Sequence, residues 1–197
     1  ISIEQLGADT CYTGGAAGNF AGGANCPKWL AVSDTGGGTW SFAGVNWDAG
    51  SRYVITSRAT AKAGNVQSQF DVGTSSRAFT YDLNLPTATI TVPVADRTRS
   101  LATITGTAAT PVGAVNLVQV RIQDVTGTGF WKLDNSGFGE ANGNNAWFSA
   151  TGPAGWATWS VSSGTFISGQ RYRFMARARN AAGNWQAAAS ATAPTWT

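Results

Sequence analysis

The sequence contains one sixteen-residue stretch twice: residues 52–67 read RYVITSRATAKAGNVQ, and residues 171–186 read RYRFMARARNAAGNWQ. The two copies agree at eight of sixteen positions without a gap, at a constant separation of 119 residues. Each copy begins with alternating apolar and polar residues, which is typical of a β-strand with one buried face. Each continues with Ala-Gly-Asn, in which glycine supplies the positive φ of a tight turn. The stretch therefore predicts one β-hairpin, used twice.

The positions that the two copies share predict particular roles. Tyrosine opens the penultimate strand in both copies, where β-sandwiches often place a tyrosine corner. Asparagine beside the turn glycine tolerates the conformation that such a turn needs. The predicted structural residues of the repeat are Tyr53, Gly64, Asn65, Tyr172, Gly183 and Asn184.

The repeat extends beyond the hairpin and predicts two units, residues 1–83 and 84–197. Residues 1–6 match residues 120–125 at the same separation. Matched tryptophans predict shared core positions, with Trp29 matching Trp147 and Trp40 matching Trp159. Residues 84–119, which include strand-like segments, have no counterpart in the first unit. We therefore expect the first unit to lack its opening strands.

Two explanations for this asymmetry stay open. Strands of a neighbouring chain could complete the first unit by β-augmentation, and such head-to-tail contacts propagate into an open filament. Alternatively, the missing strands precede Ile1 in a longer polypeptide. Under either explanation the protein is part of a modular or polymeric scaffold.

Composition favours an all-β fold. The chain has 25 glycines in 197 residues and only 12% charged residues, which suits many short strands joined by tight turns. The second unit shows about seven strand-like segments separated by turn signals. The sequence therefore predicts two tandem immunoglobulin-like (Ig-like) β-sandwiches, the first without its opening strands.

Several motifs of the second unit resemble bacterial Ig-like repeats of large secreted or surface proteins. They are Thr-Ile-Thr-Val-Pro at 89–93, Val-Gln-Val-Arg-Ile-Gln-Asp at 118–124, Thr-Trp-Ser-Val at 158–161, and the hairpin at 171–184. The resemblance covers the whole second unit and, from its middle onward, the first. It implies tandem arrays that serve as stalks, adhesin segments, fibres or accessory modules of secreted hydrolases. Ala61 and Asn180 stand where many such repeats carry aspartate, which argues against a calcium-binding turn.

The two cysteines, Cys11 and Cys26, both fall in the first unit. With no histidine in the chain and no Cys-x-x-Cys spacing, a metal or redox role is poorly supported. We predict a local disulfide, which implies an oxidising, extracytoplasmic compartment. The alternative is a pair of free buried thiols.

The sequence argues against an enzyme. The absence of histidine excludes Ser-His-Asp and Cys-His nucleophiles, and the ten carboxylates show no useful pairing. Oxygens of Glu140 and Asn142 are candidate Ca²⁺ ligands, although their spacing matches no known loop; no other metal and no cofactor is predicted. The net charge of +3 is dispersed, which argues against nucleic acid, and no apolar run is long enough for a membrane span.

Four tryptophans lie outside the matched core positions, and one of them, Trp196, loosely matches Tyr81. They are the candidate ligand or interface residues: Trp47, Trp156, Trp185 and Trp196. We expect a non-catalytic extracellular or cell-surface protein whose modules build a fibre, stalk or sheath with copies of itself or with neighbouring Ig-like modules. The alternative is a carbohydrate-binding accessory module of a secreted hydrolase, in which exposed tryptophans stack on a glycan.

Overall fold

The computed structural model describes residues 1–15, 19–22, 26–94, 98–127, 129–134, 136–162, 164–187 and, for the backbone alone, 195–196. Within these residues the chain folds into antiparallel β-strands and contains no helix, which confirms the predicted all-β class. The chain forms two compact units, Ile1–Leu83 and Asn84–Thr197. We call them unit 1 and unit 2.

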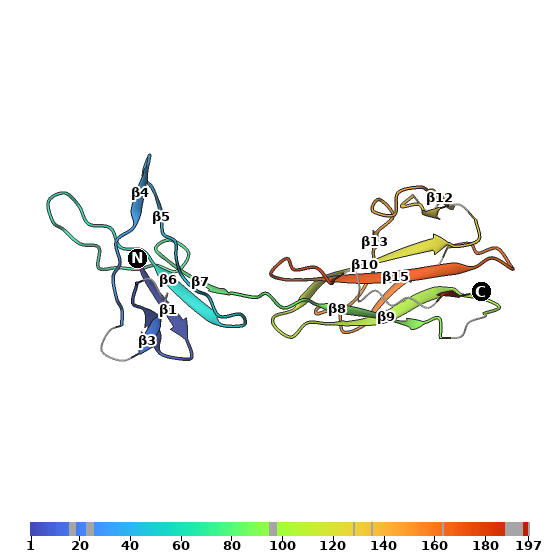
Figure 1. Ribbon diagram of the computed structural model, residues 1–197, viewed down its shortest axis with the longest axis horizontal. Helices are drawn as coiled ribbons and strands as arrows, with labels where there is room; N and C mark the ends of the chain where they lie inside the picture. The colour runs from blue at the N-terminus through green and yellow to red at the C-terminus, as the bar shows by residue number, and fades with distance from the viewer. Residues whose placement is uncertain are drawn as a thin grey trace. The chain divides into compact units, whose positions relative to one another are not determined.

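Unit 1 is built on one five-stranded sheet in the order β3-β2-β1-β6-β7 (Figure 1). Its buried cluster is formed by Ile1, Ile3, Tyr12 and Tyr53. A separate two-stranded hairpin pairs β4 with β5. The strands are β1 (Ser2–Leu6), β2 (Thr10–Tyr12), β3 (Phe20–Gly22), β4 (Ser33–Gly36), β5 (Thr39–Ser41), β6 (Arg52–Thr56) and β7 (Ser76–Thr80).

Unit 2 has two sheets, and Figure 1 shows β8 and β9 as a layer across from β10 and β15. The larger sheet has the order β12-β11-β10-β15-β16, with β13 also paired to β10, and the smaller has the order β14-β9-β8. The larger sheet contains β10 (Val115–Asp124), β11 (Phe130–Trp131), β12 (Phe138–Glu140), β13 (Phe148–Ser149), β15 (Tyr172–Asn180) and β16 (Thr195–Trp196). The smaller contains β8 (Thr87–Val92), β9 (Thr103–Ala109) and β14 (Trp159–Ser162).

The core of unit 2 lies between these layers because alternate side chains of each strand point inward. On β10 the inward side chains Val118, Val120 and Ile122 are fully buried. Phe174 of β15 and Ile104 of β9 face them in the same cluster. The side chains between them along β10 and β15 lie on the outer face of the sheet.

The repeated hairpin has the same backbone hydrogen bonds in both units. The N–H of Gly64 donates to Ala61 O at 2.9 Å, and the N–H of Gly183 donates to Asn180 O at 3.0 Å. Both glycines have positive φ, 86° and 92°. The strand that enters the turn is longer in unit 2, where β15 continues to Asn180 while β6 ends at Thr56.

The two repeat tyrosines occupy matching environments. The hydroxyl of Tyr53 accepts the N–H of Asp48 at 2.8 Å, and that of Tyr172 accepts the N–H of Ile167 at 2.9 Å. Both rings are buried, and in both cases the donor lies five residues before the tyrosine. This is the hydrogen bond that defines a tyrosine corner.

Cys11 and Cys26 form a disulfide, as predicted from the sequence. Cys11 lies on β2 and is completely buried, whereas Cys26 lies in the segment that follows β3. The bond therefore links β2, an inner strand of the five-stranded sheet, to the chain that leads to Trp29 and Leu30.

Candidate functional site

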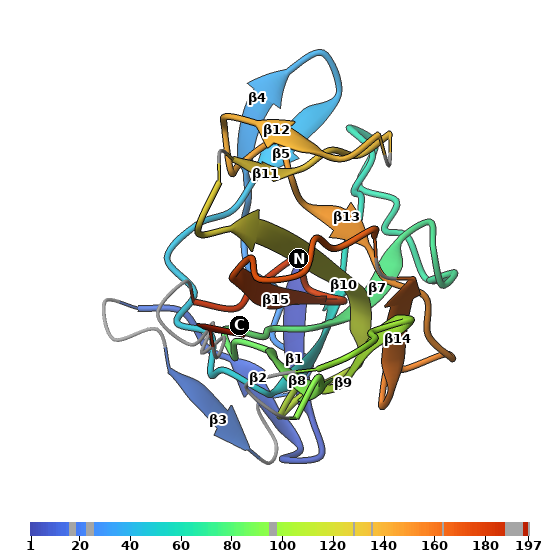
Figure 2. The ribbon, with the colours of Figure 1, turned by 90° about the vertical axis from the view of Figure 1, so that its right-hand side faces the viewer.

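The first candidate site is defined by a difference between matched tryptophans. In unit 2, Trp159 lies on β14 beside β9 (Figure 2) and is only 2% exposed. Its indole N–H donates to Thr107 O at 3.0 Å. Its strand partner is Gly106, where a Cβ atom would collide with the indole ring. The β8–β9 pair therefore supplies both the packing surface and the hydrogen-bond acceptor for this ring.

In unit 1, the matching Trp40 is 46% exposed, so the prediction that it belongs to the core is wrong. It lies on β5, which pairs only with β4, and its cross-strand partner is Asp34. The described part of unit 1 contains no counterpart of the β8–β9 pair. Among the described residues, no strand pair therefore covers Trp40 as β8 and β9 cover Trp159.

The matched glutamines show the same difference. Oε1 of Gln186 accepts the N–H of Ala178 at 3.3 Å and that of Ala88, on β8, at 2.6 Å. Oε1 of Gln67 accepts the N–H of Ala59, the counterpart of Ala178, at 3.2 Å. Gln67 thus makes the hydrogen bond within its hairpin. In the described part of unit 1 it makes no hydrogen bond to a covering strand like the one that Gln186 makes to β8. We use the term open face of unit 1 for these two positions, Trp40 and Gln67, whose counterparts in unit 2 contact β9 and β8.

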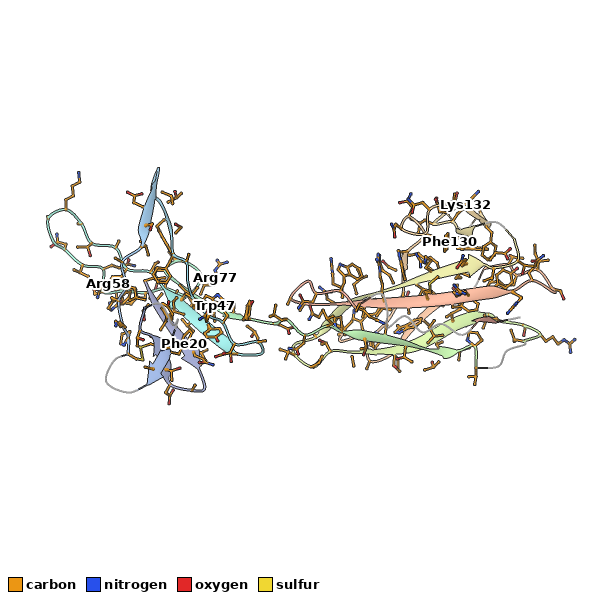
Figure 3. The ribbon with its side chains drawn as sticks, viewed as in Figure 1. Phe20, Trp47, Arg58, Arg77, Phe130 and Lys132 are labelled. Carbon is orange, nitrogen blue, oxygen red and sulfur yellow. A yellow bond between two sulfur atoms is a disulfide. The ribbon has the colours of Figure 1, made fainter. Side chains whose placement is uncertain are left out.

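The second candidate site is a stack of arginines and aromatic rings outside the core of unit 2. The guanidinium of Arg177 lies 4.3 Å from the ring centroids of both Trp147 and Trp185. Arg121 lies 4.6 Å from Trp147 and 5.0 Å from Phe130. Figure 3 shows Phe130 on the side of unit 2 that lies away from β8 and β9. We call these five residues the arginine–aromatic stack.

Unit 1 contains a shorter version of this stack. The guanidinium of Arg58 lies 4.0 Å from the ring centroid of Trp29, which packs against Phe70 at 5.4 Å. In the sequence repeat Arg58 matches Arg177, and Trp29 matches Trp147. The prediction that these two tryptophans pack in the cores is therefore corrected, since both are half-buried beside a guanidinium.

Hydrogen bonds hold the arginines of the stack in place. Nε and Nη2 of Arg177 both donate to Oε1 of Gln119, at 3.0 and 2.6 Å. Nη1 of Arg121 donates to Gly143 O at 3.0 Å. Burial lowers the pKa of Arg121, and burial followed by the charge of Arg121 lowers the pKa of Arg177. The arrangement thus brings two like charges together in a partly desolvated place.

Of the other predicted ligand residues, Trp47 takes a core position. Its ring meets Tyr53 edge-on at 4.8 Å and Phe79 at 5.1 Å, and Figure 3 shows it near Phe20. We therefore withdraw it as a ligand residue, because its aromatic partners come from the sheet itself. The sequence match could have shown this, because Phe166 stands 119 residues after Trp47 and packs against Tyr172 at 4.7 Å, as Trp47 packs against Tyr53.

The remaining candidates have different surroundings. Trp156 is half-buried against the core of unit 2, with a backbone φ of 58°. Trp185 lies on the outer face of β15, in the stack. The side chain of Trp196 lies outside the described residues, although its backbone pairs with Tyr172. Trp185 is thus the predicted ligand residue that remains best placed.

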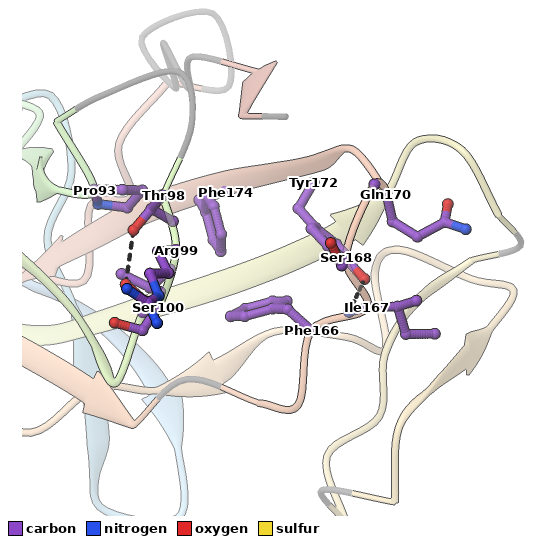
Figure 4. Close-up of a pocket in the computed structure, with 12 residues that line it drawn as sticks. Pro93, Thr98, Arg99, Ser100, Phe166, Ile167, Ser168, Gln170, Tyr172 and Phe174 are labelled. Carbon is purple, nitrogen blue, oxygen red and sulfur yellow. Dashed lines mark hydrogen bonds between the residues drawn. The ribbon is translucent and has the colours of Figure 1, made fainter.

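A pocket of about 610 Å³ opens at one end of unit 2 (Figure 4). Phe166, Tyr172 and Phe174 contribute aromatic surface to it, and Thr98, Arg99 and Ser100 contribute polar groups. The described lining includes no carboxylate, cysteine or histidine. These residues can hold an apolar group, but they do not supply a nucleophile with a base.

The described residues do not form a metal site. No group of three or more His, Cys, Asp and Glu side chains comes together in the part of the chain that the structure describes. The candidate Ca²⁺ ligands are used locally, since Oε1 of Glu140 accepts the N–H of Asn142 and Oδ1 of Asn142 accepts the N–H of Asn144. Within the same residues no helix is long and apolar enough to cross a membrane.

Comparison with known sequences adds no assignment: no protein-family model matches the chain, and no curated protein matches it. The candidate sites therefore rest on the geometry of this chain alone.

Proposed function

We propose that the chain is a non-catalytic structural or adhesive protein of an extracellular or cell-surface assembly, built from tandem Ig-like modules. The observation that carries the proposal is the contrast between Trp159, which is 2% exposed, and Trp40, which is 46% exposed. A neighbouring polypeptide that adds strands equivalent to β8 and β9 would cover the open face of unit 1. Such completion repeated head to tail builds a fibre, stalk or sheath.

Three further observations support this proposal. The disulfide fits an oxidising compartment outside the cytoplasm. The tyrosine corner in both units fits Ig-like sandwiches of the bacterial type that the sequence resembles. The open face also carries apolar and polar groups that such strands would use, since Gln67 keeps the position from which Gln186 binds β8.

Assembly is tested by electron microscopy of native material, with intact mass measured on the same sample. We expect filaments, and the intact mass shows whether their chain is longer than these 197 residues of 20.4 kDa. Trp40→Asp should abolish them, because it places a charge where the covering strands would dock. The matched control is Trp29→Asp, which adds the same charge outside the open face. Monodisperse particles of the unmodified chain contradict the proposal, and a much larger native mass would place the completing strands in the same polypeptide.

A second candidate function is a carbohydrate-binding accessory module of a secreted hydrolase. The observation that favours it is Trp185, which lies on the outer face of unit 2 and not in its core. Trp185→Ala should weaken glycan binding about 5- to 30-fold, because stacking on a ring contributes about 1–2 kcal/mol. Trp156→Ala is the control, since that ring packs on the core. Equal binding by both variants in a glycan pull-down assay would rule this function out at Trp185.

A further inference from the structure

The outer face of β10 and β15 carries a row of positive charge. Of the eight Lys and Arg residues in unit 2, four lie on this face, at Arg121, Arg173, Arg177 and Arg179. Arg173 to Arg179 extends over about 20 Å of strand, at about 3.4 Å per residue. The row is therefore long enough to contact several groups of an extended ligand.

Carboxylates in the described part of the chain do not neutralise this row. No described carboxylate forms an ion pair with these arginines. Acidic residues at the ends of β10 and β12 are used locally: Oδ1 of Asp124 accepts the N–H groups of Thr126 and Gly127, and Oε1 of Glu140 accepts that of Asn142. The charge of Arg121 opposes that of Arg177, and both are partly desolvated. An external anion would relieve this repulsion.

The arginine–aromatic stack determines which groups on this face are available to a ligand. Guanidinium groups already lie over the rings of Trp147 and Trp185, so the N–H groups of the arginines stand between these ring faces and a ligand. Nη1 of Arg177 and the whole guanidinium of Arg173 have no partner among the described residues. A guanidinium held in this way offers a planar fork of N–H groups, which matches carboxylate and sulfate.

The same geometry disfavours single-stranded nucleic acid. Sequence-tolerant binding of single strands uses open aromatic faces on which bases stack, and here arginines occupy them. The disulfide also indicates an oxidising compartment, where acidic polysaccharides are common linear polyanions.

We propose that the outer face of β10 and β15 binds a linear acidic polysaccharide, whose carboxylate or sulfate groups accept hydrogen bonds from Arg173, Arg177 and Arg179. The proposal rests on the extracellular location proposed above, and it is independent of strand completion in unit 1. Such a polysaccharide would be the ligand in the adhesive role. The arginine N–H groups would recognise it, and the tryptophans would hold the arginines in position.

Binding of the full chain to immobilised polysaccharides tests this site. Polygalacturonate presents carboxylates, heparin presents sulfates, and dextran is the neutral control. We expect binding to at least one acidic polymer, none to dextran, and weakening as salt rises. Binding to only one of the two polymers identifies the acidic group that the site prefers.

Two double variants that remove the same charge distinguish binding at this site from general electrostatic attraction between the chain and an acidic polymer. Arg177→Gln with Arg179→Gln should weaken binding at least tenfold, whereas Arg52→Gln with Arg77→Gln in unit 1 should change it less than twofold. Arg173→Gln guards against misfolding, because this side chain is exposed and has no described partner; it should weaken binding at least threefold at an unchanged melting temperature.

Three results would overturn the proposal. They are no binding to either acidic polymer, equal weakening by the unit 1 pair and the unit 2 pair, and tighter binding to single-stranded DNA than to both polysaccharides. Electron microscopy of the same variants distinguishes this failure from failure of the assembly proposal, since loss of charge on this face should leave filaments intact.

Discussion

Replacing Trp159 with alanine should lower the free energy of unfolding of unit 2 by about 3–5 kcal/mol, the usual cost of truncating a buried tryptophan. The ring is 2% exposed, packs against β9 and donates its N–H to Thr107 O. The truncation leaves a cavity beside Gly106, which has no side chain to fill it. Urea unfolding followed by circular dichroism measures the change.

The matched substitution in unit 1 is the control. Trp40→Ala should change the free energy of unfolding of unit 1 by less than about 1 kcal/mol, because the ring is 46% exposed. In filaments the same variant should be costly, since the covering strands would lose their largest apolar contact. If Trp40→Ala destabilised the unassembled chain as much as Trp159→Ala, unit 1 would have a covering layer of its own.

Removing the disulfide with Cys11→Ser and Cys26→Ser should destabilise unit 1 by about 3 kcal/mol, the loop-entropy value for a loop of about 15 residues. The effect is large relative to the unit, because its described buried cluster comprises only Ile1, Ile3, Tyr12 and Tyr53. We expect the unfolding transition of unit 1 to move to much lower temperature or to disappear. Differential scanning calorimetry measures both units in one experiment.

Unit 2 provides the internal control for the disulfide. Its core contains fifteen buried residues in the described part of the chain and no cysteine, so its transition should not move. Reduction of the unmodified chain should reproduce the effect of the double variant. A shift of both transitions to the same extent would mean that the two units do not unfold independently.

Local patterns predicted the parts of the fold that depend on neighbouring residues. The alternating strand, the Ala-Gly-Asn turn and the buried tyrosine all lie within residues 52–67 or 171–186, and their bonds close over short sequence distances. The disulfide was predictable for the same reason, because Cys11 and Cys26 are only 15 residues apart. The repeat placed the unit boundary between Leu83 and Asn84, where the two compact units meet.

The positions of the tryptophans show where prediction from the sequence fails. Trp40 and Trp159 stand in matching segments, and the same local pattern suggested burial for both. Trp47 is a predicted ligand residue, yet it packs against Tyr53 and Phe79, and its counterpart Phe166 packs against Tyr172 in the same way. The sequence around a side chain does not show whether a second layer of the fold covers that side chain.

The sequence by itself determined the all-β class, the repeated hairpin, the two units and the disulfide, because each depends on residues that are close in the chain or repeated at one separation. Only the tertiary structure decided which tryptophans are buried and that Arg121, Arg177, Trp147 and Trp185 form one stack. Those residues come from β10, the segment before β13, β15 and the segment after the turn, where Trp185 forms an isolated bridge with Arg179. Burial and cation–π contact depend on partners that are distant in sequence, so only the folded chain brings these groups together.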